Sequence, residues 1–326
     1  MLAVAACGAD TSSPAASAST PASQAAAPSA TPAPASSEAP AATPTPAPSY
    51  PLTVTDDQGT AVTIPARPER IVALAPSVTE VLFRLGAGDR TVGKTEDIDP
   101  FPPEADDLPI VSRFTGIDVE AIVGLDADLA IADTVNPPDD VAKLRELGIP
   151  VVVLDAKSID GALRDIELIG DVIGAGGEAR DLTASMQARL DQLSAATAGA
   201  AKPRTFYEIG AGDTIYTMPP DSIYAEMLKL AGADPITADA TWVIPLEKLV
   251  EADPEVIVIG DGVPVEDVAK RAGWEGMTAV KDGRVVAVHD TIVTRPGPRL
   301  VDGLAELIAA VHPEIAIPSP AVSAAP

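Results

Sequence analysis

The chain has 326 residues, of which 46% are hydrophobic and only 3% aromatic, so its core must be mainly aliphatic, and its length suits one two-lobed protein or two domains. Acidic residues outnumber basic ones by 48 to 22, for a formal net charge of −26, which disfavours nucleic acid and anionic lipid surfaces as partners. The one cysteine, Cys7, excludes a disulfide framework and a thiolate metal cluster. No apolar run reaches the roughly 18 residues needed to span a bilayer.

The first segment, residues 1–7, ends at this cysteine. Val4-Ala5-Ala6-Cys7 resembles a bacterial lipobox, in which the cysteine is lipidated and becomes the first residue of the mature protein. Only six residues precede it, without a basic region, so either translation starts upstream of Met1 or the match is accidental. We favour lipidation of Cys7, because the only cysteine lies directly before a long linker, and several acyl chains would give a stable membrane anchor.

Residues 8–50 consist almost wholly of Ala, Pro, Ser and Thr. Such a segment cannot bury enough apolar surface to offset the loss of chain entropy, and its prolines favour extended conformations. We predict a disordered tether here, and a similar disordered tail at residues 316–326.

The first globular part, residues 51–173, alternates short apolar strands with amphipathic helices. Turn residues Asp57-Gln58-Gly59 predict a hairpin at the start. The alternation that follows is typical of a parallel sheet covered by helices on both faces. The expected strands after the hairpin are 70–74, 91–93, 129–132 and 150–154, and the expected helices are 77–85, 119–124, 139–147 and 159–173.

A long helix is predicted over Glu178–Ala195, within a bridging segment at residues 174–202. Its apolar residues Leu182, Met186, Leu190 and Leu193 recur near helical spacing, and its length of roughly 27 Å could cross between two lobes. The alternation restarts in residues 203–315, with strands expected at 204–208, 255–259 and 284–288 and helices at 222–230, 246–251, 264–272 and 299–311.

An internal repeat supports two similar lobes. The segment Val119–Ile131 predicts a short helix, a turn and a strand, and Leu246–Val258 predicts the same units in the same order. Each helix carries a glutamate at its second position, Glu120 and Glu247.

The segment Arg70–Glu80, with sequence RIVALAPSVTE, resembles the opening strand and turn of the periplasmic binding proteins for cobalamin and iron–siderophore complexes. The segments Leu85–Arg90, Phe101–Glu104, Gly148–Pro150 and Arg295–Arg299 resemble segments of that family in the same order. The resemblance covers about residues 52–313. It implies an α/β fold with two Rossmann-like lobes joined by one long rigid helix, a class III substrate-binding protein with its ligand cleft between the lobes.

The resemblance also implies partners and a role for the repeated glutamates. Glu120 and Glu247 would each dock one lobe onto arginines of an ABC importer permease dimer, which works with its ATPase. The structural alternative is that each carboxylate only stabilises the first turn of its helix. The implied cargo is a metal chelate, with cobalamin favoured over a ferric siderophore and haem third, carried by a monomer at the outer side of the cell membrane.

Six residues are candidate ligand contacts. Ser77 lies in the turn after the first parallel strand, where open α/β sheets bind ligands, although Ser77 and Glu80 also match a helix capping box. Flat corrin or catecholate rings need aromatic surface, and phosphate, carboxylate or hydroxamate oxygens suit arginine. The remaining candidates are Phe114, Tyr216 and Trp242 among the aromatics, and Arg113 and Arg295 among the cations, whereas Trp274 is expected to pack at the surface.

The two histidines, His289 and His312, are too few for a three-ligand zinc site, so no metal site is predicted and a bare ion is a poor cargo. No nucleophile elbow, P-loop or zinc-protease motif is present. We therefore predict a binding protein without enzymatic activity or cofactor. The alternative class, a cell-surface enzyme on the same scaffold, would require convergent acid and base groups in the cleft.

Overall fold

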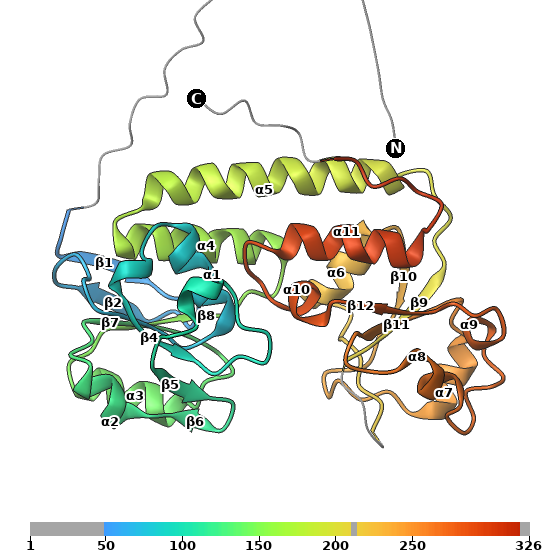
Figure 1. Cartoon of the computed structure of the whole chain (residues 1–326), viewed down its shortest axis with the longest axis horizontal. Coiled ribbons are helices and arrows are strands. Elements are labelled where there is room, and N and C mark those ends of the chain that lie inside the picture. The colour runs from blue at the N-terminus through green and yellow to red at the C-terminus, as the bar shows by residue number, and fades with distance from the viewer. Residues whose placement is uncertain (1–48, 210–213, 320–326) are drawn as a thin grey trace, which may run out of the picture. The chain divides into compact units, whose positions relative to one another are not determined.

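The computed structural model describes residues 49–209 and 214–319; Cys7 and the predicted tether up to residue 48 lie outside this part of the chain. The first half forms a six-stranded sheet in the order β6-β5-β4-β3-β7-β8 (Figure 1). Its pairings are parallel except for β5 with β6. The strands are β3 (Ile71–Ala73), β4 (Thr91–Thr95), β5 (Ile110–Arg113), β6 (Gly116–Ile117), β7 (Leu129–Asp133) and β8 (Val151–Leu154).

The second half forms a separate, four-stranded parallel sheet in the order β10-β9-β11-β12. Its strands are β9 (Arg204–Glu208), β10 (Asp234–Ile236), β11 (Val256–Gly260) and β12 (Val285–Val288). The predicted hairpin is present as the antiparallel pair β1 (Leu52–Thr55) and β2 (Ala61–Ile64). Each parallel sheet has helices on both faces, as the alternation of strands and helices predicts.

Helices of the first half cover the two faces of its sheet. Figure 1 shows α2 and α3 on one face and α1 and α4 on the other. The helices are α1 (Pro76–Arg84), α2 (Val119–Gly124), α3 (Pro138–Glu146) and α4 (Ile159–Ile173), with short 3₁₀ turns at Gly88–Arg90 and Pro103–Ala105. Side-chain caps at Asp118 and Ser158 begin α2 and α4, each by accepting a backbone N–H three residues later.

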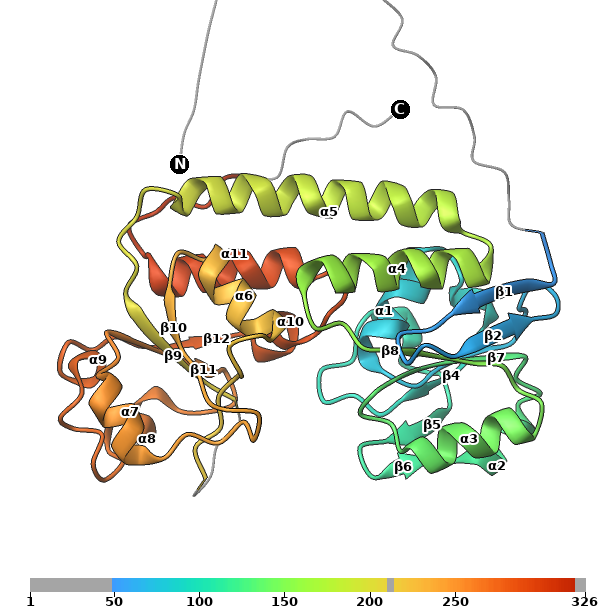
Figure 2. The same cartoon turned by 180° about the vertical axis from the view of Figure 1, so that it is seen from behind.

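The long helix α5 (Gly176–Thr197) connects the two halves and packs on α4 of the first and on α6 and α11 of the second (Figure 2). The helices of the second half are α6 (Ile223–Leu230), α7 (Leu246–Ala252), α8 (Val265–Ala269), α9 (Thr278–Lys281), α10 (Asp290–Thr294) and α11 (Leu300–Val311). No helix in the described ranges is long and apolar enough to cross a membrane.

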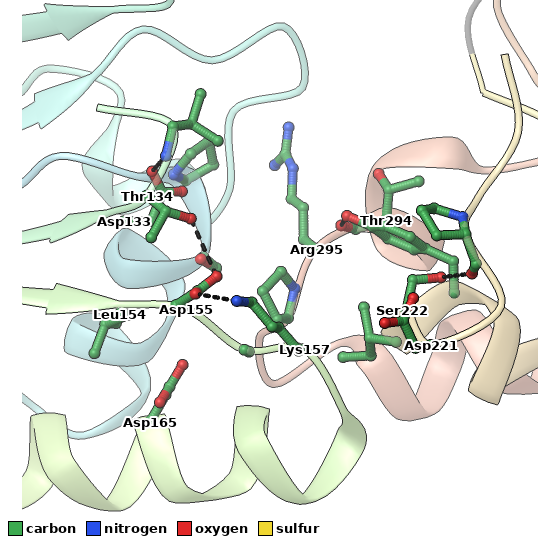
Figure 3. Close-up of a pocket in the computed structure, with 18 of the residues that line it drawn as sticks. Asp133, Thr134, Leu154, Asp155, Lys157, Asp165, Asp221, Ser222, Thr294 and Arg295 are labelled. Atoms are coloured by element: carbon green, nitrogen blue, oxygen red, sulfur yellow. Dashed lines mark hydrogen bonds and ion pairs between the residues drawn. The ribbon is translucent and has the colours of Figure 1, made fainter. Parts of the chain in front are cut away.

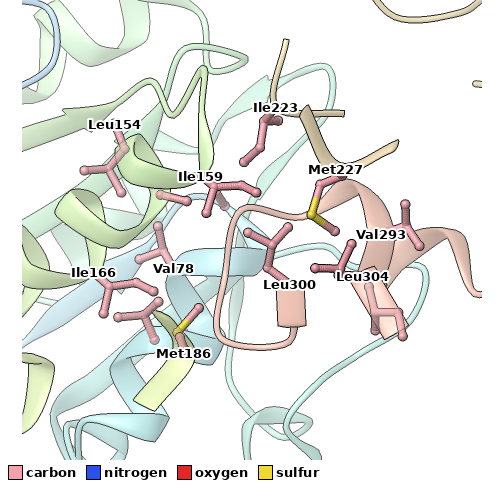
Figure 4. Close-up of a cluster of buried hydrophobic side chains, with 14 of the residues drawn as sticks. Val78, Leu154, Ile159, Ile166, Met186, Ile223, Met227, Val293, Leu300 and Leu304 are labelled. Carbon is pink, nitrogen blue, oxygen red and sulfur yellow. The ribbon is translucent and has the colours of Figure 1, made fainter. Parts of the chain in front are cut away.

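One apolar core runs from the first half into the second. It includes Val78 of α1, Ile166 of α4, Met186 of α5, Met227 of α6 and Leu304 of α11 (Figure 4). The two halves therefore share buried surface as well as a connecting helix, which opposes large hinge motion. Two further cores each belong to the outer face of one sheet.

The close packing of α4 on α5 depends on small residues. Gly170 lies in α4 opposite Ala179 of α5, and a Cβ at Gly170 would overlap that of Ala179. Each of these residues is buried. Because Gly170 and Ala179 have no side chain larger than a methyl group, α5 can lie directly against α4 at this point.

Five short elements and two local roles differ from the sequence predictions. Strands β5, β6 and β10 and helices α9 and α10, each of two to five residues, were not predicted. The predicted capping box at Ser77 is wrong, since Ala75 precedes α1 without a side-chain cap and Glu80 pairs elsewhere. The expectation for Trp274 is also wrong: its side chain is buried, edge-on to Phe206 with ring centroids 6.1 Å apart.

Candidate functional site

A cavity of about 560 Å³ lies between the two halves, beside the carboxyl ends of three strands of the first sheet. From the first half it is lined by residues at or just after the ends of β3, β7 and β8, where parallel sheets bind ligands. From the second half it is lined by Trp242, and by the start of α6 and the segment after α10 (Figure 3). The lining residues are Pro76, Ser77, Asp133, Thr134, Val135, Leu154, Asp155, Ala156, Lys157, Asp165, Pro219, Asp221, Ser222, Ile223, Tyr224, Trp242, Thr294, Arg295 and Pro296.

The wall from the first half is acidic. Asp155 accepts a hydrogen bond from the hydroxyl of Thr134 at 3.2 Å and pairs with the Lys157 ammonium at 2.9 Å. Asp133 accepts the backbone N–H of Val135 at 3.0 Å, and burial raises the pKa of this carboxyl above its usual range. Both aspartates end or directly follow a strand, so their carboxyl groups reach the cavity (Figure 3).

Asp165 extends this wall from α4. Its side chain is buried, and burial together with a hydrogen bond to the Asp57 carboxyl raises the pKa of Asp165 to about 8. Asp57 comes from the turn of the β1–β2 hairpin and accepts the backbone N–H of Asp155 at 2.7 Å. A pKa of about 8 favours the protonated Asp165 carboxyl at neutral pH, in which form it can donate to Asp57.

The aromatic part of the cavity comes from the second half. The rings of Tyr224 and Trp242 meet edge to face with centroids 5.8 Å apart, and the Tyr224 hydroxyl donates to the carbonyl of Thr294 at 3.2 Å. Trp242 has a φ of 63°, a left-handed backbone conformation that is costly for a bulky residue. Backbone strain of this kind is often retained where the side chain takes part in binding. Trp242 is available for such a role, because 37% of the residue is exposed.

An ionic network joins the two halves beside the cavity; it comprises Glu80, Asp97, Asp99, Arg295 and Arg299. Arg299 contacts both oxygens of Glu80, at 2.6 and 3.0 Å. Arg295 makes two contacts with Asp97, at 2.5 and 3.0 Å. Thr291 of α10 donates to Asp99 at 2.6 Å. These contacts fix the loop after β4 and helix α1 against the start of α11.

The structure brings three of the six predicted ligand contacts to the cavity: Ser77, Trp242 and Arg295. Arg295 already has Asp97 as its partner, so it supplies no free cation. Phe114 is 89% exposed at the β5–β6 turn, and neither it nor Tyr216 lines this cavity. Arg113 lies 3.6 Å from Glu96 and is likewise outside the cavity lining.

Sequence reasoning missed the polar lining of the cavity. The missed residues are Asp133, Asp155, Lys157, Asp165, Asp221 and Tyr224. The sequence did indicate Asp133 and Asp155, because each directly follows a predicted buried strand, where parallel sheets bind ligands. Asp165 gave no such signal, since an aspartate within an amphipathic helix is usually solvent-exposed.

The repeated glutamates occupy matching places in the two halves. Glu120 is the second residue of α2 and Glu247 the second residue of α7, and both are exposed. The helices end alike: Asp126 and Asp253 have φ values of 50° and 43°. Among the described residues, neither glutamate forms an ion pair.

The surroundings of the repeated units match as well. Arg70 at the start of β3 donates to the carbonyl of Leu125, and Arg204 at the start of β9 donates to the carbonyls of Ala252 and Asp253. The internal repeat seen in the sequence is thus a repeat of backbone and hydrogen bonding. The geometry presents one unpaired carboxylate from each half.

Within the described ranges, no group of three or more His, Cys, Asp or Glu side chains could hold a metal ion. His289 lies 3.1 Å from Asp99, and His312 is buried beside the carbonyl of Gly232. Neither histidine lines the cavity.

Comparison with known proteins agrees with this architecture. The model of the family described as periplasmic binding protein matches residues 71–291. An uncharacterized ABC transporter substrate-binding lipoprotein of Bacillus subtilis is 35% identical over 274 residues, covering 81% of this chain and 87% of the relative. A cobalamin-binding protein of Halobacterium salinarum is 32% identical over 280 residues, covering 81% and 75%.

A solved structure is similar across both halves. The periplasmic vitamin B12 binding protein of Vibrio cholerae superposes with a TM-score of 0.68 at 28% identity, covering 75% of this chain and 97% of that one.

Proposed function

Because the chain belongs to the periplasmic binding protein family, as a substrate-binding protein of an ABC transporter, we propose that it captures a corrinoid of the cobalamin class and delivers it to an importer. The observation that carries this proposal is the cavity between the two halves, with an aromatic wall on one side and polar groups on the other. A corrinoid has a flat apolar ring with a rim of amides, which such a cavity can meet.

The names of relatives support the corrinoid as cargo. A cobalamin-binding protein and a vitamin B12 binding protein share the fold over most of their length. A ferric siderophore is the nearest alternative and haem the next. Neither described histidine lines the cavity, and the hydroxyl of Tyr224, which could also bind haem iron, donates to the carbonyl of Thr294 instead.

Titration of the full-length protein tests this choice. Cyanocobalamin, a ferric hydroxamate siderophore, a ferric catecholate siderophore and haem would each be added while tryptophan fluorescence is followed. Trp242 lines the cavity and Trp274 lies in a separate core, so a bound corrinoid should quench only part of the emission. Tighter binding of either siderophore than of cyanocobalamin would refute the corrinoid assignment.

We further propose that Glu120 and Glu247 dock the protein onto the permease dimer of the importer. Each lies exposed at the start of a short helix in matching surroundings, one per half. Complementary charges at such positions would fix the orientation of a monomer across a two-fold permease and speed association. The importer's ATPase would then drive transport.

The double variant Glu120→Arg and Glu247→Arg tests docking in cells. Uptake of labelled cyanocobalamin should fall by roughly tenfold or more, while affinity of the purified variant for the ligand stays within about twofold, because neither residue lines the cavity. Glu146→Arg, at an exposed position of α3, is the matched control and should leave uptake unchanged. A loss of ligand affinity in the double variant would contradict the docking role.

Anchoring at the outer face of the cell membrane completes the proposal. It is supported by the lipobox-like segment before Cys7 and by the similar Bacillus subtilis protein named as a lipoprotein. Replacing Cys7 with Ser should release the protein from the membrane fraction. Retention of this variant in that fraction would refute anchoring through Cys7.

A further inference from the structure

The cavity has more carboxyl groups than cations, and its cations are already paired. Arg295 is held by Asp97 and only 13% of its side chain is exposed. Lys157 pairs with Asp155, although 77% of the lysine side chain is exposed. Neither cation is therefore free to receive an anionic group of a ligand without giving up an existing partner.

Two carboxylates of the cavity have no such partner. Within the described ranges, Asp133 and Asp221 form no ion pair, and Asp133 accepts the backbone N–H of Val135. Figure 3 shows Asp133 and Asp221 on opposite sides of the cavity, one from each half of the chain. Asp165 adds a protonated carboxyl at neutral pH rather than a further charge. The cavity is therefore net negative, and its charge is presented from both walls.

We infer that Asp133 and Asp221 make the cavity selective for chelates whose rim presents hydrogen-bond donors and whose net charge is not negative. This inference rests on the proposed function and specifies its substrate class. An ionised carboxylate can only accept hydrogen bonds, and it binds an N–H strongly because the bond is charge-assisted. A ligand carboxylate or catecholate at the same place would meet like charge in a partly desolvated site.

The candidate cargoes differ in the charge and in the hydrogen-bond donors that they would present to these aspartates. The primary amides around a corrin ring are donors, and a corrinoid with intact side-chain amides presents no ring carboxylate to the aspartates. Haem carries propionates, and ferric tris-catecholates are anionic, so both are disfavoured. A neutral or cationic hydroxamate complex with amide N–H groups meets the same criterion, so the charge of the cavity does not exclude it.

Cyanocobalamin and its monocarboxylic acids provide the test, because hydrolysis of one side-chain amide replaces a donor with an anion at almost unchanged size. Binding of each to the full-length protein would be measured by calorimetry at low salt. For at least one hydrolysis isomer, affinity should fall by roughly tenfold or more, which corresponds to about 1.4 kcal/mol. Added salt should reduce the difference.

The variants Asp133→Asn and Asp221→Asn, singly and together, identify the responsible groups. Each should improve binding of the weakened isomer by roughly threefold to tenfold relative to cyanocobalamin. Asp139→Asn, which removes an exposed carboxylate of α3 outside the cavity, is the matched control and should not change the ratio. Thermal melting would show that each variant is folded.

The outcomes separate this inference from the proposed function. If cyanocobalamin and all its monocarboxylic acids bind equally well, or if the asparagine variants leave their ratio unchanged, the aspartates do not select by charge, although a corrinoid is still the cargo. If cyanocobalamin fails to bind and an anionic chelate binds instead, both proposals fail.

Discussion

Removing the charge of Glu80 should destabilise the protein strongly, because this carboxylate lies at the centre of the ionic network between the two halves. Only 2% of its side chain is exposed, against 18% for Arg299. Arg299 donates to both oxygens of Glu80, and Arg295 lies 3.8 Å from one of them. Replacement by Gln keeps the shape but leaves the Arg299 guanidinium without its main counter-charge.

The size of the effect follows from burial. Removing one partner of a buried ion pair costs about 3 kcal/mol or more, mostly because the remaining charge stays desolvated. Asp99 lies 3.8 Å from Arg299 and its side chain is 37% exposed, so it can compensate only in part. For a protein of this size, a loss of about 3 kcal/mol corresponds to a fall in Tm of roughly 4–6 °C.

Thermal and urea unfolding of Glu80→Gln, followed by circular dichroism, would measure this loss. Glu251→Gln is the matched control, because Glu251 pairs with Lys248 at 2.7 Å on the surface with 71% of its side chain exposed. Such an exposed pair contributes at most about 1 kcal/mol. If Glu80→Gln and Glu251→Gln lower the stability equally, the network does not hold the halves together as argued.

Three further predictions concern the cavity and the helix that joins the halves. The free energy of unfolding should fall as the pH rises from roughly 4 to about 8, because native Asp165 keeps a proton that the unfolded chain has released. In Asp165→Asn, urea titrations at several pH values should show a smaller dependence of this free energy on pH. Gly170→Ala should cost about 1–3 kcal/mol by pushing α5 from α4, whereas Gly124→Ala, which meets nothing within 4 Å, should stay within about 1 kcal/mol in the same melts. Trp242→Phe should remove most of the ligand-induced quenching and weaken corrinoid binding roughly tenfold, and persistent quenching would assign the signal to Trp274 instead.

The order of strands and helices could be predicted from the sequence because burial on both faces of a parallel sheet requires continuous apolar runs. The runs at Ile71–Ala73, Val151–Val153 and Val256–Ile259 each became a buried strand. Short edge strands such as Asp234–Ile236 have no such run and were missed. The predicted domain boundaries remain a prediction, although the change of sheet occurs within the predicted bridging segment.

Residues of the candidate site were predictable only where they directly follow a predicted strand, because the end of a parallel strand fixes their position in space. Ser77 follows a predicted strand and lies at the cavity, as expected for the carboxyl end of a parallel sheet. Arg295 was expected to bind an anion, but its partner Asp97 lies 198 residues earlier in the chain. No local pattern reveals a pairing of that kind.

The sequence by itself determined the alternation of strands and helices, the repeated helix–turn–strand unit with one glutamate in each half, and the resemblance to a chelate-binding family, because these follow from local periodicity and residue order. Tertiary structure alone decided the sign of the cavity's charge. The unpaired aspartates are those whose neighbouring arginines pair with other carboxylates. Those ion pairs join segments that are far apart in the chain.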